Sequence, residues 1–153
     1  MAAGNTIFPY KAKLNFFNAT GILGANPANF RLALYSNLFV PDDATDEVLA
    51  DINNEIAAGN GYTAGGEALT TVTLTQTGGV VKFTADPIIW TASGGSIPAW
   101  RYGYFYYLGT LNGKVNPLIG HFLGDNTPAD IPATTNGNTL TVTPNASGIV
   151  VAN

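Results

Sequence analysis

The sequence contains a single histidine, His121, and no cysteine among its 153 residues. Acid–base and nucleophilic catalysis usually relies on a histidine, a cysteine or paired carboxylates in a pocket. His121 lies within the apolar run Leu118–Leu123, which has the character of a strand, so we interpret it as a structural residue. Without cysteine the chain can form no disulfide, no thiolate nucleophile and no Cys-based metal site. It also lacks the Gly-x-Ser-x-Gly pattern of a serine nucleophile elbow.

Four acidic residues cluster at Asp42, Asp43, Asp46 and Glu47. Such a cluster could supply a glycosidase carboxylate pair or a calcium loop. The calcium-loop spacing of alternating acids, a glycine and a terminal glutamate is absent. Carboxylates also favour the first turn of a helix, because they complement the helix dipole. We therefore interpret the cluster as the solvated start of a helix, and we expect no catalytic residue, no metal site and no cofactor.

A second cluster consists of glycines around one tyrosine: Gly59, Gly61, Tyr62, Gly65 and Gly66. Glycine-rich loops can cradle phosphates, but that motif needs Gly-Lys-Ser/Thr at the start of a helix. Here Gly66 is followed by Glu67 and then by a strand-like run. We therefore predict a structural turn in which at least one glycine has a positive φ, and no nucleotide site.

Aromatic residues concentrate in one part of the chain, at Trp90, Trp100, Tyr102, Tyr104, Tyr106 and Tyr107. They could form a sugar-binding platform, or they could fill a core and a subunit interface. In the run Trp100–Leu108, Trp100 is expected on the same face as the even-numbered tyrosines, with Phe105 and Tyr107 on the other face. A strand that is apolar on both faces must be covered on both, so we favour packing over sugar binding.

One face of this strand would pack against the core of the domain. The other face would be covered by a helix or arm of the same chain, or by a neighbouring subunit. We predict a subunit interface, and hence a homo-oligomer, at Trp100, Arg101, Phe105 and Tyr107, because Arg and Trp are enriched at interfaces. The variant Phe105→Asp would then be a soluble monomer, whereas a core position for Phe105 would make it an unfolded chain.

Alternation of apolar and polar residues predicts about seven short strands, with a last short one at the C-terminus. They cover Phe30–Ser36, Thr71–Thr75, Val80–Ala85, Pro87–Thr91, Trp100–Leu108, Leu118–Leu123, Leu140–Val142 and Ile149–Ala152. The pairs Gly78-Gly79 and Asn112-Gly113 predict hairpin turns. Helices are expected at Tyr10–Asn18 and at Thr45–Ala58, where apolar residues recur every four positions. A loop with one helical turn is the alternative for Thr45–Ala58, and an irregular segment is the alternative for Tyr10–Asn18.

This order of elements predicts a mainly β fold. The expected architecture is an antiparallel β-sandwich, of jelly-roll or immunoglobulin-like type, with one or two short helices. The length of 153 residues favours one domain, which we place at residues 10–153 behind an N-terminal arm of residues 1–9.

Charged residues make up only 10% of the chain, and its formal net charge is −4. Globular proteins usually carry about 25% charged residues, so this surface is either neutral and polar or covered by neighbours. Lys11 and Lys13 form the only close basic pair, and we expect neither a nucleic-acid partner nor a membrane partner. No apolar run is long enough to span a membrane and no secretory signal is seen, so we expect synthesis in the cytoplasm.

Three pieces of the chain carry recognisable motifs in a fixed order. They are Phe30–Ser36 (FRLALYS), Gly61–Leu69 (GYTAGGEAL), and Asp86–Trp90 (DPIIW) followed by Trp100–Tyr102 (WRY). Together they resemble a widespread family of small structural proteins of tailed-bacteriophage virions, over residues 10–125. The chain departs from the family in its acidic segment before the GYTAGG turn and in the longer loop Ser93–Ala99.

The resemblance implies a virion component without enzymatic activity, which packs against copies of itself and other capsid or tail proteins. It implies synthesis in the host bacterial cytoplasm and a final location in the virion. The expected classes are capsid decoration (cement) proteins and head–tail associated proteins. The alternative is a carbohydrate- or receptor-binding module of a tail fibre, suggested by the aromatic residues. A third hypothesis, which we do not favour, is a glycan hydrolase that uses Asp42 or Asp46.

Overall fold

The computed structural model describes residues 4, 6, 7, 9, 26–77, 80–127 and 129–152. The predicted helix Tyr10–Asn18 and the turn residues Gly78 and Gly79 lie outside the described residues. Described strands, in chain order, are β1 (Phe30–Tyr35), β2 (Glu67–Ala68), β3 (Thr73–Thr77), β4 (Val80–Thr84), β5 (Ile88–Thr91), β6 (Tyr102–Tyr107), β7 (Thr110–Leu111), β8 (Lys114–Val115), β9 (Leu118–Leu123), β10 (Thr139–Val142) and β11 (Val150–Ala152). The prediction of a mainly β fold is confirmed, and the strands pair in antiparallel sheets.

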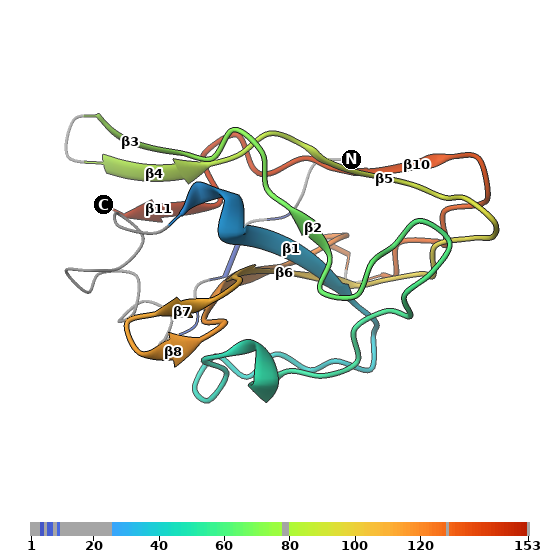
Figure 1. Ribbon diagram of the computed structural model, residues 1–153, viewed down its shortest axis with the longest axis horizontal. Coiled ribbons are helices and arrows are strands. Elements are labelled where there is room, and N and C mark those ends of the chain that lie inside the picture. The colour runs from blue at the N-terminus through green and yellow to red at the C-terminus, as the bar shows by residue number, and fades with distance from the viewer. Residues whose placement is uncertain are drawn as a thin grey trace.

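The central sheet has the strand order β2-β1-β6-β9. β1 and β6 lie side by side along their whole length, from the pair Phe30–Tyr107 to the pair Tyr35–Tyr102 (Figure 1). The register of β6 on β9 shifts between Phe105 and Tyr106. The described part of the predicted arm covers the outer edge of β9, where Ile7 pairs with His121.

The remaining strands form smaller sheets. β3 and β4 form the predicted hairpin, and β11 pairs with the other side of β4. β5 pairs with β10. β7 and β8 form a short hairpin at Asn112-Gly113, where both turn residues have a positive φ, of 51° and 74°. That geometry suits the right-handed twist of a two-residue hairpin, so the prediction from this dipeptide is confirmed.

The main core lies on one face of the central sheet. It joins residues of β1, β6 and β9 to residues of β4, β5, β10 and β11, which lie above that sheet in Figure 1. The largest of its fully buried side chains are Trp90, Trp100, Phe83, Phe105 and Phe122. In β1 and β10, every second residue supplies this core, as the alternating sequence pattern predicts.

The opposite face of the central sheet is covered by residues 37–57 of the same chain, which run below it in Figure 1. Phe39, Leu49 and Ile52 pack there against a second buried cluster that includes Tyr104 and Tyr106. The predicted helix Thr45–Ala58 is wrong, because the structure has only the 3-10 helix η3 (Leu49–Asp51) in this region. The alternative, a loop with one helical turn, is the arrangement observed.

Candidate functional site

The glycine-rich turn predicted at residues 59–66 packs directly on two strands. All four of its glycines have a positive φ, so the prediction of left-handed backbone is confirmed. A Cβ atom on Gly61 would lie 2.0 Å from the carbonyl oxygen of Thr91 in β5. A Cβ atom on Gly66 would lie 1.8 Å from the carbonyl oxygen of Leu32 in β1. Glycine is therefore required here both by the backbone angles and by the close approach of two strands.

The carboxylate of Glu55 holds this turn from inside. One of its oxygens accepts hydrogen bonds from the Tyr62 hydroxyl and from the Gly65 amide, each at 2.7 Å. The Tyr62 hydroxyl in turn accepts a 2.9 Å hydrogen bond from the Leu34 amide of β1. Burial raises the pKa of the Tyr62 phenol far above its ordinary value, so the hydroxyl keeps its proton for Glu55.

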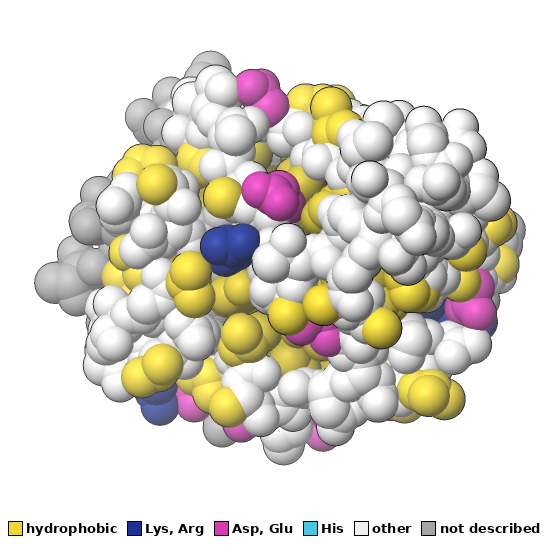
Figure 2. Space-filling model, turned by 45° about the vertical axis from the view of Figure 1, so that its right-hand side comes forward, with side chains coloured by type: hydrophobic (Ala, Val, Ile, Leu, Met, Phe, Trp, Pro, Cys, Tyr) yellow, Lys and Arg dark blue, Asp and Glu magenta, His cyan; other side chains and the backbone are white. Residues whose placement is uncertain are grey.

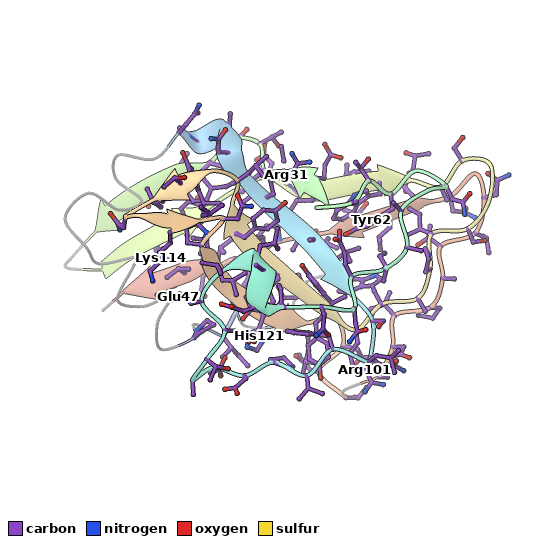
Figure 3. All side chains as sticks on the ribbon, turned by 60° about the horizontal axis from the view of Figure 1, so that its bottom comes forward. Arg31, Glu47, Tyr62, Arg101, Lys114 and His121 are labelled. Carbon is purple, nitrogen blue, oxygen red and sulfur yellow. The ribbon has the colours of Figure 1, made fainter. Side chains whose placement is uncertain are left out.

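Two side chains of the central sheet hold the same turn from the other side. The Arg31 guanidinium donates to the carbonyl oxygen of Gly66 at 2.7 Å, and the Tyr106 hydroxyl donates to that of Gly65 at 2.7 Å. Neither contact is predicted by a pattern in the sequence. The one signal was Arg31 itself, a charged residue inside an otherwise apolar strand (Figure 3).

Replacing Glu55 with alanine is expected to lower the free energy of unfolding by about 1–3 kcal/mol, because the buried Tyr62 hydroxyl loses its acceptor. Glu55→Gln keeps a carbonyl oxygen in the same place and should lose less than half as much. Urea denaturation of the three proteins measures both values. Equal losses for the alanine and glutamine variants would show that the negative charge, and not the acceptor, holds the turn.

The residues predicted at a subunit interface lie mostly inside the chain. Trp100 and Phe105 are each only 1% exposed and Tyr107 is 7% exposed, and all three belong to the main core. No neighbouring subunit is needed to cover them. The face predicted for Trp100 is also wrong: Trp100 precedes β6, pairs with Ile131 and packs on the side of Phe105, so the two-residue alternation does not extend to it.

Arg101, the fourth predicted interface residue, is partly exposed. Its Nε atom donates to Asp130 Oδ1 at 2.7 Å, and the other carboxylate oxygen of Asp130 accepts from Asn37. The pair joins the loop before β6 to the segments around residues 37 and 130. Arg101, labelled in Figure 3, thus has a contact within its own chain, and its contact with another subunit remains a prediction.

The aromatic residues that suggested a sugar-binding platform are also buried. Trp90, Trp100, Tyr104 and Tyr106 have exposed fractions of 2% or less. Sugar platforms present the faces of aromatic rings to solvent, and these faces pack against other core residues instead. The tyrosine row therefore contributes to the core of the described domain.

The acidic segment 42–47 lies over the face of the central sheet that is opposite the main core, and ion pairs hold it there. Asp43 Oδ1 lies 2.9 Å from Nε2 of His121, whose ring is buried in β9. Glu47 accepts a 3.1 Å hydrogen bond from Lys114 of β8 (Figure 3). His121 thus has a structural contact, and the carboxylates do not begin a helix, contrary to the interpretation from their spacing.

Asp46 is the most buried carboxylate of this segment, with 6% of the residue exposed. Burial raises the pKa of its carboxyl group above the ordinary value of 3.8, and the nearby carboxylates of Asp42 and Asp51 raise it further. A raised pKa in the folded state means that folding favours the protonated form. Stability from this group is therefore present below pH 3.8 and is lost as the pH rises through the raised pKa.

The variant Asp46→Asn is accordingly expected to be more stable than the natural protein at pH 7. Its amide oxygen can still accept the hydrogen bond that Asp46 receives from the Asp42 amide. The gain should be small, on the order of a few degrees in Tm, and should shrink below pH 4. Thermal unfolding at several pH values measures it. A less stable variant at neutral pH would mean that attraction between Asp46 and His121 outweighs the cost of burial.

Within the described residues, no three His, Cys, Asp or Glu side chains come together in a group that could hold a metal ion. In the same part of the chain, no helix is long and apolar enough to cross a membrane. Comparison with models of known protein families, with curated proteins and with solved structures finds no match to this chain.

Proposed function

We propose that this protein is a structural subunit of a tailed-phage virion, a capsid decoration (cement) or head–tail associated protein that acts by packing against other subunits. It would be made in the host bacterial cytoplasm and end in the virion. Its partners would be copies of itself and other virion proteins, without catalysis. The resemblance in the three sequence motifs is the origin of this proposal. Its fold would be the β-sandwich of that family, with the main core between the two layers of strands.

The observation that carries the proposal is that the few basic side chains bind acceptors within the chain. Of the basic residues in the described ranges, Arg31, Arg101 and Lys114 each bind an acceptor of the same chain. Uncharged side chains and backbone dominate the face shown in Figure 2, where acidic and basic side chains appear as scattered spots. Soluble monomers usually keep a mixed, charged exterior, whereas surfaces buried between subunits are depleted in charge.

The direct test is mass spectrometry of purified phage particles produced from the genome that encodes this chain. The expected result is a fixed number of copies per particle, in proportion to the major capsid or tail protein. A second preparation, from a genome with this gene interrupted, should give particles that lack the chain and are less stable to heat. Wild-type particles that lack the chain would refute the proposal.

A further inference from the structure

The sequence has several long stretches without Asp, Glu, Lys, Arg or His, and three of them lie at residues 56–66, 87–100 and 131–149. They are far apart along the chain, and they contain the glycine-rich turn, β5 with the loop after it, and β10 with the loop before it. In Figure 1 they meet at the right-hand end of the molecule. The fold therefore brings parts of these three uncharged stretches together at one end.

Hydrogen bonds tie these loops to each other. The Ser93 amide donates to the carbonyl oxygen of Asn60 at 3.1 Å, and the Asn60 side chain donates to that of Ser96 at 3.1 Å. The Gly94 amide donates to the Asn136 side-chain oxygen at 3.0 Å. Further backbone pairs join residue 97 to 134 and residue 92 to 137 and 138. The loops are thus held in one arrangement before any partner arrives.

We call a group of exposed, uncharged residues at this end the neutral patch. It consists of residues 57–60, Ile89, Thr91, residues 93–94, Ser96 and residues 135–139. Its strand part is the outer face of β5 and β10, where Thr91 pairs with Thr139. Ile89 is 58% exposed there and is its largest apolar side chain. Figure 2, in which this end comes forward, shows a broad area without charged side chains.

The composition of the neutral patch restricts what can bind it. A charged surface pressed against it would lose hydration without gaining a counter-charge, which costs free energy. Depletion of charge is typical of the centre of a protein interface, and Ser, Gly and Asn loops supply adaptable hydrogen bonds in antibody paratopes. Loops that are already fixed also lose little conformational entropy on binding.

We infer that the neutral patch is a self-contact, through which two copies of this chain pack face to face about a twofold axis. A second copy brings the same uncharged surface, so no charge is buried and no like charges meet. A twofold contact uses one patch on both partners, as the commonest symmetric assemblies do. This inference rests on the proposed function, which needs repeated contacts between copies, and it specifies where one of them lies.

The test places charges in the neutral patch. Ile89→Lys and Ile89→Glu should each be folded but weaken self-association at least about tenfold, because like charges then face each other. An equimolar mixture of the two variants should associate again, since the opposite charges now attract. Light scattering and sedimentation over a dilution series measure the association. About 10 mM salt is suitable, because the Debye length is then roughly 30 Å and the introduced charges interact across the contact.

The matched controls are Val115→Lys and Val115→Glu, since Val115 is 63% exposed and lies on β8, outside the patch. Both should associate like the natural chain. A natural chain that is monomeric at all concentrations, Ile89 variants that associate normally, or a mixture that stays dissociated would each overturn the inference. Particle analysis tests the proposed function separately, because a chain that pairs through this patch but is absent from virions would refute only that function.

Discussion

Gly66→Ala is expected to leave the chain largely unfolded, because a methyl group at this position meets the backbone of the central sheet. A Cβ atom there would lie 1.8 Å from the Leu32 carbonyl oxygen and 2.5 Å from its carbon. Leu32 pairs with Phe105 on one side and with Glu67 on the other, so it cannot retreat without breaking the sheet. We expect a loss of more than about 4 kcal/mol, a large share of the stability of a domain of this size.

Gly113→Ala is the matched control for this variant. Gly113 has nearly the same backbone angle, with φ of 74° against 69° for Gly66, but nothing lies within 4 Å of its Cβ position. It should lose only about 1–2 kcal/mol, the cost of left-handed backbone for a residue with a side chain. Urea denaturation followed by the fluorescence of the buried Trp90 and Trp100 measures both losses. Equal losses would show that the backbone angle alone, and not the contact with Leu32, makes glycine necessary.

The strands were the predictable part of this fold. Their signal is local, since alternation of apolar and polar residues reports one buried face wherever the chain is extended. The dipeptide Asn112-Gly113 likewise specifies its own hairpin, because both residues tolerate positive φ. The arrangement of the strands into sheets could not be predicted from the sequence in the same way. The pairing of β1 with β6 joins residues about 70 positions apart along the chain, which no local pattern encodes.

The predicted helix at Thr45–Ala58 shows how a local pattern can mislead. Ile52 and Ile56 have helical spacing, but Ile56 lies in the main core and Ile52 packs in the second cluster. The Ile56 amide donates to the Leu34 carbonyl of β1 and not to a neighbouring turn. Asn54, with φ of 64°, ends any helical run between them. Tertiary contacts therefore override the periodicity.

The glycine-rich turn was predictable in kind but not in its contacts. Clustered glycines indicate left-handed backbone, and this holds at all four positions. That Glu55, Arg31 and Tyr106 hold the turn depends on which strands lie beside it. The neutral patch is a similar case. Its stretches are visibly uncharged in the sequence, yet only the fold shows that they meet at one end.

Phe105→Asp is expected to abolish cooperative folding. Phe105 is 1% exposed in the middle of β6, with its ring centroid 5.4 Å from that of Phe122. A carboxylate at this position would be surrounded by apolar side chains and has no counter-charge in the main core. Burying an isolated charge costs far more than the few kcal/mol that stabilise a domain. The variant should therefore be insoluble or unfolded by circular dichroism, and not the soluble monomer expected of an interface residue.

Two control variants separate the effect of the introduced charge on stability from the effect of losing the aromatic ring. Phe105→Leu keeps an apolar side chain of somewhat smaller volume and should fold with a loss of about 1–3 kcal/mol. Val115→Asp places the same carboxylate at a residue that is 63% exposed, and its stability should change by less than about 0.5 kcal/mol. A folded, soluble Phe105→Asp monomer would contradict this position for Phe105. It would mean that a neighbouring subunit covers the face of β6 that carries Phe105, as the two-sided apolar pattern of this strand also allows.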